Sequence, residues 1–379
     1  MTLDYMIILK RGAKTLLLIS LLMSQIADAA QASRFIEKSG KSEMVVITEE
    51  TEDEEPLYEK LKQHFKSKYL SIGAWLRSDF EYQQSRNNEE DNGFEISRFR
   101  LTFGGELDGG MGYVMQSDFF LSPSILDAKI YYRISESFTI DVGQFKAPFS
   151  GEVLRSGADR DFVRAASLAV LAPRRQIGVQ FRGWIRQDLI SYAVGIFNGN
   201  GRVNDNDNGK FMYVARITYS GQPLVGLPLG FLDVEEDDKK VDLGLNIAFS
   251  EDDDVEIPSL VSNFSGKRFL VGVDSRLRRG KMLLSGEVIY AHLDQKTGAT
   301  KKPFGYHVTS GYVLNPKTRI LVRFDNLQTD GLDDDTSFLI FSYSHRPTKV
   351  TRLQVNYGID LDNRAFDKNR FFCSFQFRF

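Results

Sequence analysis

Basic side chains concentrate in residues 146–174, and their type and spacing suit the binding of oxyanions. These basic residues are Lys146, Arg155, Arg160, Arg164 and Arg174, with Arg175 directly after them. A guanidinium group is planar, stays charged at any relevant pH and donates paired hydrogen bonds to phosphate-like oxygens. The same residues include three acids, Glu152, Asp159 and Asp161. Two interpretations stay open: the cations line an anion path, or Arg160 and Arg164 pair with the two aspartates on a loop surface.

The chain shows no arrangement typical of a catalytic or metal site. One cysteine, Cys373, and four scattered histidines exclude an intramolecular disulfide and a multi-cysteine zinc site. Residues 204–209 resemble the start of a calcium loop, but Ala215 stands where the bidentate glutamate belongs. No serine or aspartate has a recognisable histidine partner, so an enzyme barrel is disfavoured. We therefore expect no catalytic residue, metal or cofactor, and a net charge of −3 favours no nucleic acid partner.

The N-terminus is typical of a secretory signal peptide. Basic residues up to Lys14 precede an apolar run over 16–23, and small residues follow at Ala27 and Ala29. The apolar run is too short to span a bilayer. We predict a signal peptide over residues 1–29, with cleavage after Ala29 or, as second choice, after Ala32. Translation starts at Met1 or at Met6.

The next segment, residues 30–68, is predicted to be a mostly disordered linker. Residues 48–55 are almost entirely acidic, and such a charge block repels itself and cannot bury a core. Within the linker, Leu57, Leu61 and Phe65 are spaced by four and indicate a short amphipathic helix. The sequence does not indicate a function for this linker.

The remaining residues, 69–379, alternate with the period of two that is typical of strands. For example, Ala128, Ile130, Tyr132 and Ile134 share one face, and polar residues occupy the other. The same pattern predicts sixteen strands over residues 70–83, 94–107, 112–120, 125–134, 138–145, 176–185, 189–197, 211–219, 241–249, 268–277, 282–292, 304–314, 318–326, 337–345, 351–359 and 371–379. All ten prolines lie outside these ranges, as expected for strands that pair on both sides.

Connection lengths indicate an outer-membrane barrel. Short links follow most even-numbered strands and longer polar links follow most odd-numbered ones, which is the arrangement of periplasmic turns and outer loops. An even strand number then places both termini, and the linker, in the periplasm. Two links depart from this rule: 121–124 is short for an outer loop, and 220–240 is long for a turn. Acidic stretches at 252–254 and 333–335 are predicted to be solvated loop tips, with a divalent bridge to lipopolysaccharide as the alternative.

The last predicted strand favours a barrel in lipid over a soluble sandwich. Phe371, Phe375, Phe377 and Phe379 share one face, which suits the apolar band of a barrel better than an exposed sandwich edge. A 42% hydrophobic, 26% charged composition fits such a barrel, because apolar residues face lipid and charges face water on alternate positions. One barrel over residues 69–379 therefore accounts for the length of the chain without several separate domains.

Three stretches resemble the phosphate-selective porin O and P family of Gram-negative outer membranes. They are Gly143-Gln144-Phe145-Lys146-Ala147-Pro148-Phe149, Ala172-Pro173-Arg174-Arg175-Gln176-Ile177-Gly178-Val179-Gln180 and Gly195-Ile196-Phe197-Asn198-Gly199-Asn200-Gly201. The resemblance covers roughly residues 69–379 and leaves out the acidic linker. It implies an all-β, sixteen-stranded antiparallel transmembrane barrel, a homotrimer, and facilitated diffusion of small anions through the outer membrane. It also implies that the C-terminal Phe379 is read by the barrel-assembly machinery.

The resemblance further implies that the link over residues 146–174 folds into the barrel and forms its constriction. We predict an apolar helical stretch over 162–171 within it. Arg98 and Arg100 are expected on the facing wall of the anion path, and Lys129, Arg133 and Arg182 on a secondary part of the lumen wall. About half of the wall cations are expected to pair across strands instead. The predicted function is an anion porin that could take phosphate or polyphosphate-like oxyanions; the alternatives are a non-selective porin and a structural or adhesive barrel.

Overall fold

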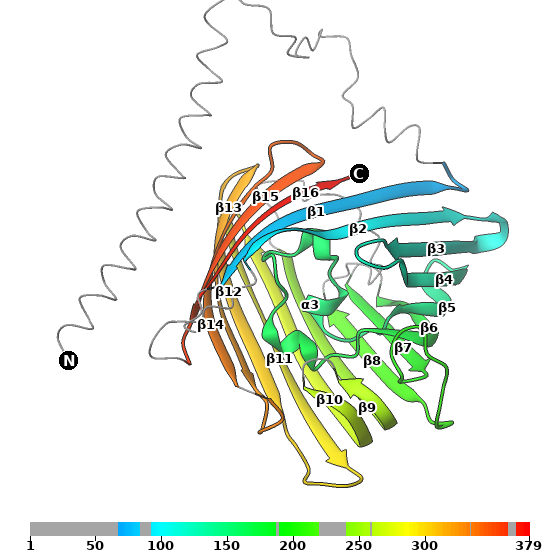
Figure 1. The fold of residues 1–379 in the computed structure, drawn as a ribbon. Helices are drawn as coiled ribbons and strands as arrows, with labels where there is room; N and C mark the ends of the chain where they lie inside the picture. Colours follow the sequence, from blue (N-terminus) through cyan, green and yellow to red (C-terminus); the bar gives the residue numbers. More distant parts are fainter. Residues whose placement is uncertain are drawn as a thin grey trace, which may run out of the picture. The chain divides into compact units, whose positions relative to one another are not determined.

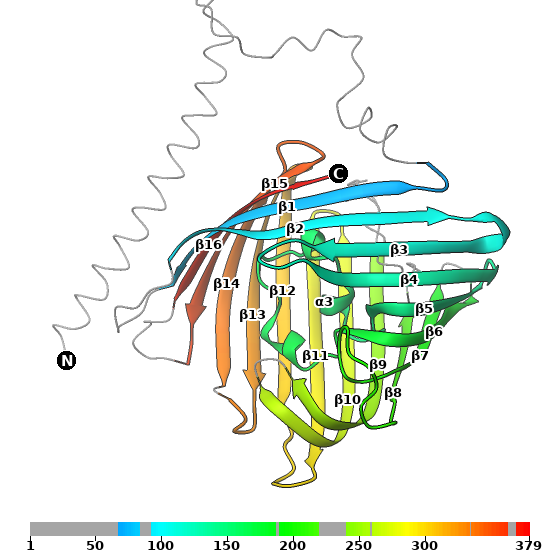
Figure 2. The same ribbon diagram turned by 45° about the vertical axis from the view of Figure 1, so that its right-hand side comes forward.

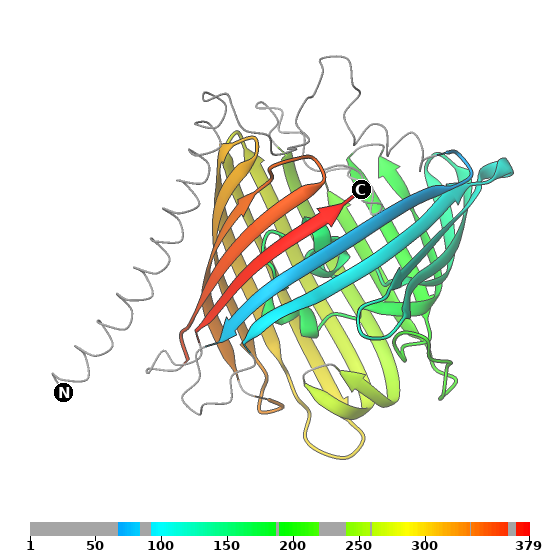
Figure 3. The ribbon, with the colours of Figure 1, turned by 45° about the horizontal axis from the view of Figure 1, so that its top comes forward.

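The computed structural model describes residues 67–83, 92–186, 189–219, 240–257, 260–333, 335–362 and 369–379. The predicted signal peptide, almost all of the linker and the long link over 220–239 lie outside the described residues. In the described part of the chain, sixteen antiparallel strands close into a barrel in which each strand pairs with the next and the last strand pairs with the first (Figures 1 and 3). The expected fold is confirmed.

The strands agree closely with the predicted ranges at most positions. They are β1 Ser71–Gln83, β2 Gly93–Glu106, β3 Met111–Asp118, β4 Ser124–Ser135, β5 Phe138–Lys146, β6 Arg175–Arg186, β7 Ile190–Phe197, β8 Met212–Tyr219, β9 Lys240–Ile257, β10 Val261–Arg279, β11 Met282–Gln295, β12 Phe304–Asn315, β13 Thr318–Gln328, β14 Thr336–His345, β15 Thr351–Asp360 and β16 Arg370–Arg378. Four short helices complete the described elements: α3 Gly151–Leu154, η1 Asp108–Gly110, η2 Gly157–Asp159 and η3 Ser167–Val170.

Side chains alternate between lipid and lumen along each strand. On β9, Leu245 and Ile247 are 56% and 46% exposed on the outer face, whereas Asn246 between them is fully buried on the inner face. On β16, Phe375 points outward while Ser374 and Gln376 are buried. This inversion of a soluble sheet, apolar outside and polar inside, is the arrangement that a lipid-embedded barrel requires.

The C-terminus closes the barrel. The backbone N–H of Ala74 donates to Phe379 O at 3.2 Å, and the N–H of Phe379 donates back to Ala74 O at 3.1 Å. In Figure 3, β1 lies between β16 and β2, next to the chain end marked C. The last residue therefore completes the backbone pairing that removes an open edge.

The predicted ends of β9 and β10 are wrong, because both strands extend well beyond the expected 241–249 and 268–277. The acidic stretch 252–254 lies inside β9 and is not a loop tip. Asp252 pairs with Arg268 at 3.0 Å on the inner face, and Asp253 pairs with Lys296 at 3.0 Å. Asp252 and Asp253 are compatible with a strand because each has a basic partner. Figure 2 shows this long hairpin curving away from the straighter strands.

Candidate functional site

The segment that joins β5 to β6, residues 147–174, folds into the barrel; we call it the inner loop. Figures 1 and 2 both show α3 and its flanking chain within the ring of strands. Its backbone amides donate hydrogen bonds to side chains of distant wall strands. Glu152 N–H donates to Glu287 at 2.8 Å, and Val163 N–H donates to Asn356 at 2.7 Å. Ser167 N–H lies 3.0 Å from both oxygens of Asp325.

The carbonyl groups of the inner loop are held by the same wall. Arg352 and Gln376 both donate to Ala158 O, at 3.1 and 3.0 Å, and Arg77 donates to Val163 O at 3.3 Å. These partners come from β15, β16 and β1, so the inner loop crosses the lumen from its attachment at β5 and β6. Among the described residues, no hydrogen bond joins it to β2, β3 or β4.

The helix predicted over 162–171 is wrong: only η3, Ser167–Val170, is helical there. The amides of Val163 and Ser167 are taken by wall carboxylate and amide oxygens, so they are not available for a regular helix. Ala166 N–H lies 3.4 Å from an oxygen of Glu152. Side-chain acceptors from the wall and from Glu152 of the inner loop thus replace the hydrogen bonds that a helix would have formed.

The second half of the inner loop packs in an apolar cluster inside the barrel, which the sequence analysis did not predict. Leu168 is fully buried, and the extended ends of β9 and β10 contribute Ile257 and Phe264. Inward-facing wall residues of the same cluster are Phe145, Phe197, Met212, Val214, Ala248, Leu270, Ile289, Ala291, Leu293 and Leu327. The signal was present in strands that are apolar on both faces, such as 288–291, because such strands are covered on both sides.

A basic group lies where the inner loop faces β2. The pKa of Arg160 is lowered by burial, which Glu152 opposes, and also by the positive charges of Arg174, Arg155 and Arg98. Arg100 is the neighbour of Arg98 on the inner face of β2. Lys146 ends β5 and Arg175 begins β6. We call Arg98, Arg100, Lys146, Arg160, Arg174 and Arg175 the basic rim.

Three members of the basic rim have acidic partners. Arg100 pairs with Asp118 at 2.8 Å, and Arg175 holds Asp127 through two hydrogen bonds of 2.9 Å. Arg160 is 3.8 Å from Glu152. The open alternative, pairing of Arg160 with Asp159 or Asp161, is not what the structure shows. These pairs lower the net positive charge of the rim but do not cancel it.

The other three members have no carboxylate partner among the described residues. Arg98 donates to the carbonyl oxygen of Ser97, and Arg174 is exposed without an ion pair in the described part of the chain. Lys146 donates to Leu154 O at 3.2 Å and to Arg155 O at 2.9 Å. Lys146 therefore holds the first turn of the inner loop.

Arg155 and Arg164, which the sequence analysis assigned to the same path, point elsewhere. Arg164 pairs with Glu81 of β1 and lies over the ring of Phe372 at 5.4 Å. Arg155 pairs with Asp161 at 3.0 Å. The structure thus brings six of the eight predicted path residues together and directs the other two toward acids.

Asp161 is the centre of an arginine cluster that the sequence analysis did not identify. Arg276 and Arg319 lie 2.8 and 3.0 Å from its carboxylate, in addition to Arg155. Burial raises the pKa of Asp161, but Arg276, Arg319 and Arg155 outweigh it and hold this pKa well below its usual range. Strand alternation places Arg276 and Arg319 on the lumen wall, and their common partner Asp161 comes from the inner loop.

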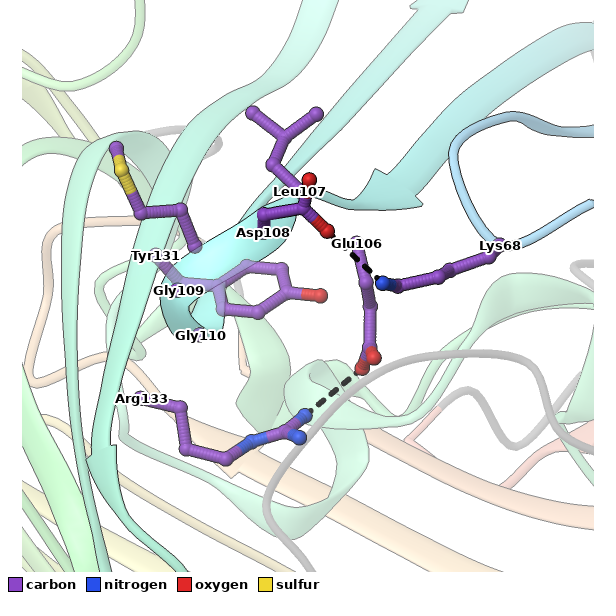
Figure 4. A pocket seen from close by; sticks show the side chains of 9 residues that line it. Lys68, Glu106, Leu107, Asp108, Gly109, Gly110, Tyr131 and Arg133 are labelled. Atoms are coloured by element: carbon purple, nitrogen blue, oxygen red, sulfur yellow. Dashed lines mark hydrogen bonds and ion pairs between the residues drawn. The ribbon is translucent and has the colours of Figure 1, made fainter.

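The three residues of the predicted secondary wall are all ion-paired. Lys129 and Arg182 share Asp141, at 3.2 and 2.6 Å. Arg133 pairs with Glu106 at 2.9 Å beside a pocket of about 250 Å³ near η1, where Lys68 pairs with Asp108 (Figure 4). Pairing across strands therefore dominates this part of the wall, as the sequence analysis expected for about half of the wall cations.

Comparison with known proteins identifies the family. The sequence profile of the phosphate-selective porin O and P family matches residues 71–330. The chain belongs to this family. No curated protein matches its sequence significantly. The family and the fold indicate an outer-membrane channel rather than an enzyme.

Solved porins share the fold of this family member at low sequence identity. The anion-selective porin from Comamonas acidovorans has 10% identity and a TM-score of 0.60, covering 82% of this chain and 99% of that one. The channel DcaP of Acinetobacter baumannii has 14% identity and a TM-score of 0.55, covering 82% and 97%. A trimer form of Vibrio cholerae OmpT has 12% identity and a TM-score of 0.55, covering 82% and 99%. Among the described residues, no helix has the length and apolar character needed to cross a bilayer.

Proposed function

We propose that this porin passes small anions, phosphate-like oxyanions among them, by facilitated diffusion through a water-filled channel. The observation that carries the proposal is the basic rim, in which Arg98 and Arg174 lack carboxylate partners among the described residues and the positive charges of both act on Arg160. Selectivity in a wide barrel depends on the charges at its narrowest part. A rim with more cations than acids lowers the energy of an anion there and raises that of a cation.

The path runs between the inner loop and the wall formed by β2–β6. The inner loop and its apolar cluster occupy the side of the lumen next to β9–β13, and its hydrogen bonds extend to β15, β16 and β1. The side that carries Arg98 and Arg100 makes no such bonds among the described residues. A solute that crosses the barrel on this side passes the whole basic rim.

The ion pairs of the wall support a second candidate, a channel with weak selectivity. Lys129 and Arg182 share one aspartate, and Arg100 and Arg175 each have one. A paired cation attracts a passing anion less than a free one, because the local charges offset one another. The anion preference therefore rests mainly on Arg98 and Arg174.

Reversal potentials across a planar bilayer under a salt gradient test this function. The double variant R98Q/R174Q should lower the ratio of chloride to potassium permeability, because it removes two cations without freeing an acid among the described residues. The matched control is K317Q, which removes an exposed cation in the turn between β12 and β13 that has no ion pair among the described residues, and it should leave the ratio unchanged. An unchanged ratio in R98Q/R174Q would refute the assigned path.

The assembly of the porin follows the family. A homotrimer is proposed, in line with the trimer form of the structural neighbour OmpT. Phe379 is proposed as the signal for the barrel-assembly machinery, and outer-membrane lipid and lipopolysaccharide are proposed as the surroundings of the apolar outer face. The N-terminal signal peptide and periplasmic linker remain predictions from the sequence.

A further inference from the structure

A row of titratable side chains lies on the wall beneath the first half of the inner loop. Asp274, Glu287, His307 and Asp325 stand directly opposite one another on β10, β11, β12 and β13. Glu287, His307 and Asp325 are 3%, 7% and 1% exposed. The mechanism proposed above uses none of them, although two of these carboxyl groups hold backbone amides of the inner loop.

Glu287 differs from the other carboxyl groups of this row. Asp274 is held by Arg216 at 2.8 Å, and Asp325 lies 3.2 Å from Arg323. Glu287 has no ion pair among the described residues. One of its oxygens accepts the amide of Glu152 at 2.8 Å, and the other, Oε1, is buried without a hydrogen-bond partner.

The charged groups around Glu287 make its ionised form unfavourable. Asp274 faces it from β10 and Glu152 faces it from the inner loop, where Arg160 and Arg155 outweigh the effect of burial and lower the pKa of Glu152. The positive charge of Arg155 also attracts a charge on Glu287, but Arg155 is paired with Asp161. His307 of β12 is buried, and its Nδ1 has no hydrogen-bond partner among the described residues. Arg323 of β13 pairs with Asp325. A negative charge on Glu287 would therefore be buried and repelled by two carboxylates.

We propose that Glu287 positions the inner loop as a neutral carboxylic acid, and that loss of its proton at alkaline pH loosens the first turn of the loop. A neutral carboxyl group still accepts the amide of Glu152 through its carbonyl oxygen. Ionisation adds repulsion between Glu287 and both Asp274 and Glu152, and the Glu152 backbone is part of α3. The stabilisation is present at low pH and is lost as the pH rises through the value at which the folded protein releases this proton.

The inference rests on the chain being a channel and not on its anion preference. The experiment measures brief closures of single channels of the full-length protein in a planar bilayer, from about pH 5 to pH 9. We expect the closure frequency to rise toward alkaline pH, by at most about tenfold per pH unit for one proton. E287Q should remove this rise, because glutamine keeps an acceptor for the Glu152 amide and cannot ionise.

The matched control is D325N. Asp325 is the other carboxyl group of the row that accepts a backbone amide of the inner loop, and it pairs with Arg323. D325N should retain the alkaline rise, and so should H307Q. A second variant, D274N, removes one repelling charge and frees Arg216, so the rise should move to lower pH. The D274N shift tests the proposal even if E287Q does not fold.

Four results would overturn the proposal. They are a wild-type closure frequency that does not change with pH, an alkaline rise that persists in E287Q, a rise abolished by H307Q, and an unshifted or upward-shifted rise in D274N. Each of these can occur with anion preference intact. Failure here is therefore distinguishable from failure of the proposed function, which is read from reversal potentials.

Discussion

Arg276 of β10 donates from its guanidinium to the carboxylate of Asp161 at 2.8 Å, although the two residues are 115 positions apart. Arg319 of β13 and Arg155 of the inner loop share the same carboxylate. Asp161 is 95% buried, so this is the centre at which the inner loop is fixed to the opposite wall. This contact therefore helps to fix the course of the inner loop inside the barrel.

Replacing Asp161 should release this part of the inner loop. D161N leaves three guanidinium groups without their common acid, and breaking a buried ion pair costs about 3–5 kcal/mol. Because 1.4 kcal/mol corresponds to about tenfold in an equilibrium constant, loop release should rise by more than about a hundredfold. Single-channel recordings should show many more closures in D161N. A quiet D161N channel would contradict the anchoring role of this residue.

Acid should loosen the same contact only at very low pH. The pKa of Asp161 is held well below its ordinary value, so its stabilisation is present above the unfolded-state pKa of about 3.9 and is lost as pH falls through the folded value. Closures should therefore stay rare near pH 4 and increase in stronger acid. In D161N the acid-dependent change should be absent. An increase already complete at pH 5 in the wild type would contradict the assignment.

Lys146 should matter for the position of the inner loop. K146M removes the donor to the carbonyl groups of Leu154 and Arg155, two hydrogen bonds worth about 0.5–1.5 kcal/mol each. We expect more frequent closures. K129M is the matched control, because Asp141 keeps Arg182 and the inner loop loses no hydrogen bond. Equal closure frequencies in the two variants would refute the role of Lys146 in holding the loop.

A larger residue at Gly305 should displace the inner loop from β12. A Cβ atom at this glycine would lie 2.7 Å from the Cβ of Leu168 and 3.1 Å from its Cα, so η3 would have to move. G305V should destabilise the packing of the inner loop on β12 by about 1–3 kcal/mol, as overpacking generally does. Hydrogen–deuterium exchange of the peptide around Leu168 should report faster exchange.

The matched control for G305V is G93V. An added Cβ at Gly93 meets nothing within 4 Å, so exchange around Leu168 should match the wild type. Protection of the Leu168 peptide that is equal in G305V and the wild type would mean that η3 does not pack on β12 as described.

The barrel was predictable from the sequence because its pattern is local. Alternation along 127–134 and 371–379 places side chains on the correct faces without knowledge of their partners. The wall cations, such as Arg276 and Arg319, follow from the same alternation. The family resemblance added the inward course of the inner loop, which the structure shows.

The contacts of the inner loop could not be predicted, because they join residues far apart in the chain. Nothing in the sequence around Val163 indicates that its amide donates a hydrogen bond to Asn356. This contact is one reason that the helix predicted over 162–171 does not form. The extension of β9 was missed for a similar reason, since the ion partner of Asp252 is Arg268 on the neighbouring strand β10. Arg155 was assigned to the anion path by its charge alone, whereas its partner Asp161 determines where it points.

The reversal potential of the wild-type porin in a planar bilayer with a potassium chloride gradient tests the central claim most directly. The basic rim, with Arg98 and Arg174 lacking carboxylate partners in the described part of the chain, predicts a potential of the sign that marks chloride as the more permeant ion. A potential of the opposite sign, which marks potassium as the more permeant ion, would contradict the account.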